Sequence, residues 1–209
     1  MRDLANKRMR ILNVLQKYAC YYQYNNREEK LLITSSVMNF LWNQWNNFWR
    51  DYWLAHVTGG IYLDRSNINP LFPNYTDKQG CNHLLIICGR RKKKTEGNSI
   101  AGNYQEISWG DPQNMTKIAS SMSVQHNHLT YLLSLVGVYQ TRIKHFQKIR
   151  NSFIHLNNEN INRLNSISGY YSFEPNQEII EILESQDIES SNRCFDSLMN
   201  NMTGMIRNL

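Results

Sequence analysis

The segment of this 209-residue chain best suited to chemistry runs from Lys148 to His155. It contains an Arg at position 150, an Asn directly after it, and a His five positions beyond the Arg. If the segment is helical, Asn151 and His155 are one turn apart and share a face. Arg150 starts roughly 140° around the helix from His155, but its long side chain can reach the same cleft. We therefore expect these three groups to act together.

Arg, Asn and His are the groups that cleavage of RNA without a metal ion requires. The 2′-hydroxyl attacks the adjacent phosphate, so the reaction needs a base, an acid and positive charge on the phosphorane. An imidazole, with an ordinary pKa of about 6.5, can act as base or acid at neutral pH. A guanidinium grips a phosphate with two hydrogen bonds. Because one His cannot easily be base and acid in one step, a symmetric dimer is expected to supply the second.

This segment resembles the signature of the HEPN superfamily, in which an Arg is followed by four to six residues and then a His, with Asn, Asp or His favoured after the Arg. The resemblance at motif level covers Val138 to Leu164. It implies a late helix of a helical bundle and a homodimer whose paired motifs form one composite ribonuclease site. It also implies an RNA substrate, no cofactor, and a role as a toxin or anti-phage defence effector with an antitoxin or defence partner.

By this resemblance, His155 is the acid–base group, Arg150 stabilises phosphate charge and Asn151 orients the reacting groups. Many family members also carry an acidic residue just after an aromatic position of the early helix. The matching region here has Asn47, and Asp51 lies one turn further on, so both are secondary site candidates.

Other interpretations of these residues remain open. A second match to the pattern, from Arg50 to His56, ranks lower because it ends the early Trp-rich helix, where the family does not place its motif. Arg150 and His155 can also be an ordinary surface Arg and a hydrogen-bonded helix His. The alternative function is a non-catalytic HEPN-like module that dimerises and scaffolds a defence or toxin–antitoxin complex.

The charge balance favours an anionic partner. The net charge is +6 and the sequence pI about 9.1, which suits nucleic acid. Much of the excess lies in one basic run, which is most simply a solvated loop and alternatively a contact for the RNA backbone. That run consists of Arg90, Arg91, Lys92, Lys93 and Lys94.

Several classes of protein are disfavoured. The sequence has no Gly-rich phosphate loop, no serine-hydrolase elbow and no zinc-protease motif. A zinc site would have to draw on Cys81, His83, Cys88, His126 and His128, whose spacing matches no usual ligand pattern. The first ten residues are polar and basic, and the longest apolar run is too short to span a bilayer. We expect a cytoplasmic protein with reduced thiols and no membrane partner.

The elements that position these residues are expected to be helices. The pattern predicts an all-α fold, a bundle of four to six helices, in a single domain over 1–209 with a loop-rich insertion at 59–112. A short strand is expected at His83–Cys88, and the last helical region should be interrupted near Ser190. The predicted helices are 2–24, 28–57, 113–140, about 141–167 and about 176–207. Four Trp at helical spacing are predicted to form a packing stripe: Trp42, Trp45, Trp49 and Trp53.

Overall fold

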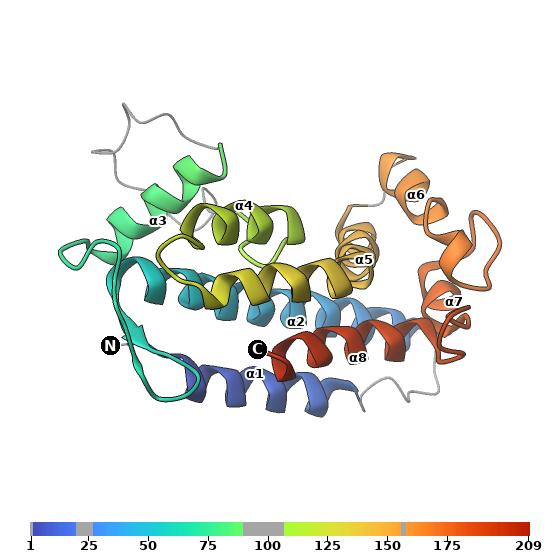
Figure 1. The fold of residues 1–209 in the computed structure, drawn as a ribbon. Coiled ribbons are helices and arrows are strands. Elements are labelled where there is room, and N and C mark those ends of the chain that lie inside the picture. The colour runs from blue at the N-terminus through green and yellow to red at the C-terminus, as the bar shows by residue number, and fades with distance from the viewer. Residues whose placement is uncertain (1, 20–26, 90–106, 156–157) are drawn as a thin grey trace. The chain divides into compact units, whose positions relative to one another are not determined.

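The computed structural model describes residues 2–19, 27–89, 107–155 and 158–209, and these are predominantly α-helical (Figure 1). The all-α prediction is confirmed, although these residues form eight α-helices instead of four to six. The helices are α1 (Leu4–Ala19), α2 (Arg27–Thr58), α3 (Asp77–Ile87), α4 (Pro112–Met122), α5 (His128–Ile154), α6 (Asn158–Asn165), α7 (Ile179–Glu184) and α8 (Cys194–Arg207).

The chain divides into two compact units. The first unit comprises Met1–Ile11, Gln44–Val138 and Leu209, and the second comprises Leu12–Asn43 and Tyr139–Asn208. Helices α1, α2 and α5 each contribute residues to both units. The predicted insertion at 59–112 belongs wholly to the first unit.

The first unit is organised around the aromatic half of α2. Trp45, Trp49 and Trp53 are fully buried, which confirms that the Trp stripe is core. Two of their indole nitrogens donate hydrogen bonds to the chain before α4: Trp45 to the carbonyl of Gly110 at 2.9 Å and Trp53 to that of Trp109 at 3.2 Å. These bonds satisfy polar groups that burial would otherwise leave unpaired.

A small three-stranded sheet follows the end of α2. It consists of β1 (Arg2–Asp3), β2 (Gly60–Ile61) and β3 (Asn67–Ile68), in the order β1-β2-β3. Strand β1 is parallel to β2, and β2 is antiparallel to β3. The described part of the insertion, residues 59–89 and 107–112, therefore contains strands and a helix where the sequence predicts mainly loop.

The strand predicted at His83–Cys88 is wrong, because this segment completes helix α3. Thr76 and Gln79 form a capping box at the start of the helix, each side chain accepting a hydrogen bond from the other's backbone N–H. Cys81, Leu84 and Leu85 are buried on one side. A short apolar run does not by itself distinguish a buried helix from a strand. Here the capping box at Thr76 and Gln79 is the feature that indicates a helix.

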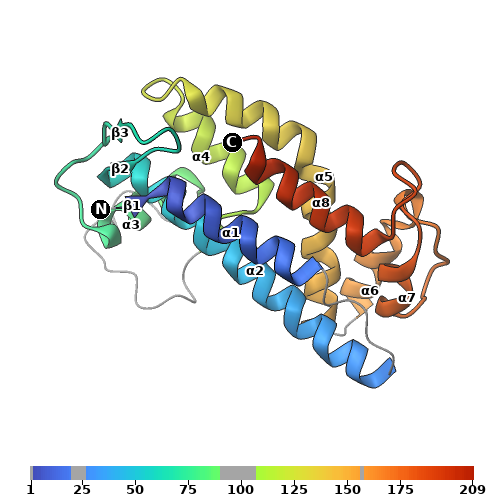
Figure 2. The same ribbon diagram turned by 90° about the horizontal axis from the view of Figure 1, so that it is seen from below.

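The second unit packs the first half of α2 against the last half of α5. Trp42 of α2 stacks on Phe146 of α5, with ring centroids 6.1 Å apart. Asn39, one turn before Trp42, bonds to Arg150, one turn after Phe146. Residue numbers rise along α2 while those of the contacting residues fall along α5, so the two helices run antiparallel here. Figure 2 shows α1 alongside this part of α2, where Tyr18 packs on Phe40.

A buried polar network joins α5 to α8 within the second unit. The guanidinium of Arg142 donates to Asp187 at 3.0 Å, and Ser197 donates to the other carboxylate oxygen at 2.6 Å. Burial alone would raise the pKa of Asp187, but these hydrogen bonds and the positive charge of Arg142 lower it. Asp187 lies in the 185–193 connection between α7 and α8. This break between the two helices confirms the predicted interruption near Ser190.

The predicted boundary between the two middle helices is wrong. Helix α4 ends at Met122 and α5 begins at His128, so the break falls well before residue 140. Gly137 lies inside α5, exposed, with no atom within 4 Å of where a Cβ would stand. A glycine on a solvent face weakens a helix without ending it.

Among the described residues, no helix combines the length and apolar character needed to cross a bilayer. The basic run at 90–94 lies outside the described residues.

Candidate functional site

Arg150 is held in place by two Asn side chains of the second unit. Its Nε and Nη2 donate to Oδ1 of Asn39 at 3.1 and 2.5 Å, and its Nη1 donates to Oδ1 of Asn151 at 3.0 Å. A guanidinium has five N–H groups, so these bonds leave one on each terminal nitrogen without an acceptor among the described residues. Partial burial lowers the pKa of Arg150, yet a guanidinium remains charged at neutral pH.

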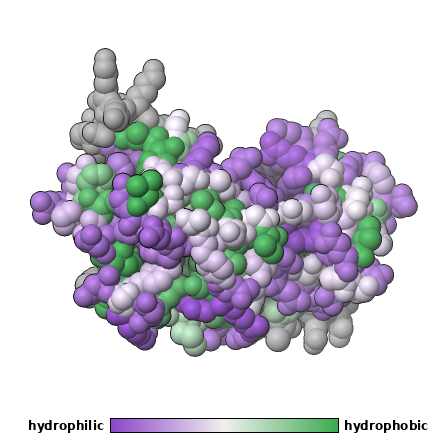
Figure 3. All heavy atoms as spheres, in the orientation of Figure 1, coloured by the Kyte–Doolittle hydropathy of each residue, from purple (hydrophilic) through white to green (hydrophobic). Residues whose placement is uncertain are grey.

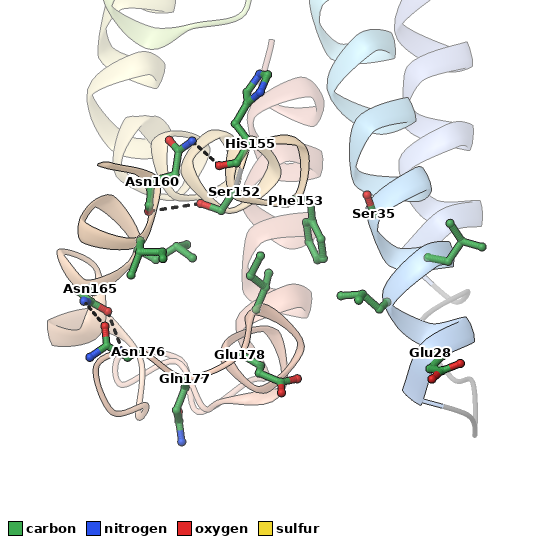
Figure 4. A pocket seen from close by; sticks show the side chains of 15 residues that line it. Glu28, Ser35, Ser152, Phe153, His155, Asn160, Asn165, Asn176, Gln177 and Glu178 are labelled. Carbon is green, nitrogen blue, oxygen red and sulfur yellow. Dashed lines mark hydrogen bonds between the residues drawn. The ribbon is translucent and has the colours of Figure 1, made fainter. Parts of the chain in front are cut away.

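His155 is the first residue after α5. Its backbone N–H donates to the carbonyl of Asn151 at 2.9 Å, so it continues the helical spacing. Its own carbonyl accepts from the buried side chain of Asn160 at 2.7 Å, which anchors the end of α5 to α6. The imidazole itself is exposed. Figure 4 shows it at the rim of a cavity, pointing away from the apolar walls.

The three predicted site residues thus lie at one end of α5. A side-chain bond joins Arg150 to Asn151, and a backbone bond links Asn151 to His155. Within the described part of the chain, no hydrogen bond connects the imidazole of His155 to either of the others. A phosphate acting on all of them would have to approach from solvent.

The secondary candidates Asp51 and Asn47 belong to the first unit. Asp51 forms ion pairs with Arg2 at 3.4 Å and with Lys7. Asn47 is exposed on α2. Their role in the site stays a prediction.

The lower-ranked His56 is an unsuitable acid–base group. It is fully buried, and burial lowers its pKa to about 3. Its Nδ1 lies 2.8 Å from the carbonyl of Tyr52, which can only accept, so Nδ1 carries the proton. Its Nε2 must then accept from Nε2 of His128, 2.7 Å away. This imidazole is locked in one neutral form inside the first unit, as a packing residue.

A cavity of about 710 Å³ opens beside His155, within the second unit (Figure 4). One wall is the start of α2, with Leu31, Leu32 and Ser35, and another is the end of α5, with Ser152 and Phe153. The remaining lining comes from α6 and the approach to α7: Asn160, Ile161, Leu164, Asn165, Asn176, Gln177, Glu178 and Ile179. No local sequence pattern indicates this cavity, because its α2 wall lies more than 100 residues from the rest of its lining.

Basic side chains lie along α5 near this end, and the basic residue of α6, Arg163, pairs with Glu159 of the same helix. Lys148 donates to the hydroxyl of Ser166 at 2.9 Å. Its pKa is lowered by burial and by the charges of Arg163 and Lys144. Figure 3 shows the visible face over α6 and α7 as mainly hydrophilic, with isolated apolar residues. These cations favour an anion at the end of α5.

Among the described residues, no group of three or more His, Cys, Asp or Glu side chains is arranged to hold a metal ion. Cys81 and Cys88 are buried free thiols, and His83 packs edge-on against Phe72.

Comparisons with models of known protein families, with curated proteins and with solved structures give no match to this chain.

Asn39 and Asn160 are the two supporting residues that sequence reasoning did not identify. Asn39 belongs to a row of Asn on α2 beside the Trp stripe, and this row is the one signal that could have indicated it. Asn160 follows His155 closely, but its bond to the His155 carbonyl depends on the turn between α5 and α6.

Proposed function

We propose that this protein is a metal-independent endoribonuclease of the HEPN type, acting as a homodimer in a toxin or anti-phage defence role inside the cell. The observation that carries the proposal is the fixed guanidinium of Arg150, with one N–H left on each terminal nitrogen, five residues before an exposed imidazole at His155. An antitoxin or defence-system protein would restrain the activity.

In the proposed reaction, His155 of one copy removes the proton from the 2′-hydroxyl, which attacks the adjacent phosphorus. His155 of the second copy protonates the leaving 5′-oxygen. The products are a 2′,3′-cyclic phosphate and a 5′-hydroxyl. Arg150 stabilises the charge on the phosphorane with its two remaining N–H groups. Asn151 keeps the guanidinium oriented.

The test is to incubate the purified protein with total RNA and excess chelator. Wild type is expected to cleave, and His155→Ala and Arg150→Ala are each expected to lose at least about 100-fold in rate. Thr141→Ala, an exposed change on the same helix, is the matched control and should cleave normally. Cleavage should also fall more steeply than the protein concentration once the dimer dissociates.

Equal inactivity of all four proteins, with an intact dimer, would contradict the ribonuclease and support the non-catalytic scaffold. Activity abolished by the chelator would contradict the metal-independent mechanism.

A further inference from the structure

The cavity beside His155 has two chemically different ends. His155 stands at one end, and Glu28 and Glu178 stand at the opposite end (Figure 4). Between them the walls are mainly apolar, with Phe153 on the α5 side (Figure 4) and Leu31 and Leu32 among the lining residues of α2. A volume of about 710 Å³ is within the range of small-ligand sites.

We propose that this cavity binds one unpaired nucleobase of the RNA, adjacent to the phosphate that is cut. The inference rests on the proposed function, since it takes His155 as the residue at the scissile phosphate. A flat, uncharged base suits apolar walls, and the ring of Phe153 offers a surface on which it can stack. The volume leaves room for the ribose as well.

The charges set the direction in which a nucleotide enters. Lys148, which donates to Ser166 at 2.9 Å, places positive charge near the end of α5, where the phosphate would lie, while Arg163 of α6 pairs with Glu159. At the other end the carboxylates of Glu28 and Glu178 line the cavity, and Arg27 pairs with Glu178 at 2.6 Å and with Glu181 at 3.8 Å. A phosphate is repelled there, whereas carboxylates accept hydrogen bonds from the exocyclic amino group of a base. We therefore expect adenine and cytosine, which carry that amine, to bind better than uracil.

Two neighbouring serines provide a matched pair of variants. Ser35 lines the cavity from α2 and is partly exposed. Ser36, the next residue of α2, is exposed and outside the lining. Ser35→Trp should fill the cavity, and Ser36→Trp should leave it open. Phe153→Leu serves as a second variant, because it keeps the wall apolar and removes only the stacking surface.

Binding and cleavage are measured separately. Fluorescence anisotropy with labelled oligo(dA), oligo(dC) and oligo(dT) decamers reports binding without cleavage, and the matching RNA decamers report kcat and KM. Wild type and Ser36→Trp should bind the A and C decamers at least about fivefold more tightly than the T decamer. Ser35→Trp should lose this preference, and Phe153→Leu should raise KM by about fivefold or more.

The outcomes separate this inference from the proposed function. If Ser35→Trp and Phe153→Leu cleave and bind like wild type while His155→Ala is inactive, the base site is overturned and the ribonuclease stands. If wild type never cleaves but Ser35→Trp abolishes a preference for A and C decamers, the ribonuclease fails and the base site stands. If Ser35→Trp leaves oligonucleotide binding intact but releases a co-purified protein, the cavity holds a protein partner and the base site is overturned.

Discussion

At the scale of single residues, the site depends on how one guanidinium is oriented. Asn39 uses a single carbonyl oxygen to hold two nitrogens of Arg150, and Asn151 holds the third. Both partners are neutral amides, so they fix the Arg without cancelling its charge. A carboxylate in either place would compete with a phosphate for the same cation.

Asn39 is therefore expected to act as a positioning residue for Arg150. Asn39→Ala should lower kcat/KM for RNA about tenfold, since hydrogen bonds to a charged group contribute roughly 1.5–3 kcal/mol. Asn39→Asp should keep Arg150 oriented but raise KM, because its charge opposes the phosphate. Steady-state kinetics on one RNA substrate measure both effects.

Asn43→Ala is the matched control, one turn further along α2 and exposed. It should behave as wild type. If Asn39→Ala also keeps wild-type kinetics, the orientation of Arg150 does not depend on Asn39.

At the scale of elements, α5 carries the site and must stay helical from His128 to Ile154. Gly137 is its weakest interior position. Gly137→Ala should raise the free energy of unfolding by about 0.5–1 kcal/mol, because alanine is the better helix former and the added Cβ meets nothing within 4 Å. Urea unfolding followed by circular dichroism measures the change.

Gly110→Ala, in contrast, should lower the free energy of unfolding. A Cβ at Gly110 would lie 2.2 Å from the indole nitrogen of Trp45, so the buried aromatic core would have to move. A loss of stability in Gly137→Ala would mean that the helix bends at this glycine.

The sequence predicts the helical character because periodic apolar positions persist along α1, α2 and α5. Prediction from the sequence fails where the apolar pattern is short, or where two contacting residues are far apart in the chain. The apolar run at 84–87 reads as a strand until the capping box at Thr76 is considered. The site residues on α5 are close in sequence and could be selected by spacing. Asn39 lies 111 residues from Arg150, and no local pattern reveals such a pairing.

At the scale of the whole molecule, both units bury histidines in neutral form. His56 in the first unit has a pKa lowered to about 3, mainly by burial. His145 in the second unit has a pKa lowered to about 4, by burial and by the charges of Arg142 and Lys148. His126 and His128, which pack on the ring of His56, also have lowered pKa values. As the pH falls, each of these histidines is therefore protonated in the unfolded chain at a higher pH than in the folded protein.

Stability should therefore be complete above pH 6.5, the ordinary histidine pKa, and should fall as the pH drops towards 4. Each such histidine lowers the free energy of unfolding by about 1.4 kcal/mol per pH unit in that window. His56 and His145 together account for roughly 5 kcal/mol between pH 6.5 and about 4.5, which is comparable with the whole stability of many domains. Urea unfolding at a series of pH values measures this slope.

The variant His56→Gln tests the first unit's share of that slope. Glutamine can still donate to the Tyr52 carbonyl but cannot take up a proton, so the variant should be less stable at pH 7.5 and have a shallower acid dependence. Leu84→Ala is the control, because it removes buried apolar contacts from the same unit and leaves every histidine in place. It should lower the free energy of unfolding at every pH without changing how steeply that free energy depends on pH. An unchanged slope in His56→Gln would show that His56 takes up its proton in the folded state as readily as in the unfolded chain. The locked His56–His128 pair would then not be what makes the fold acid-sensitive.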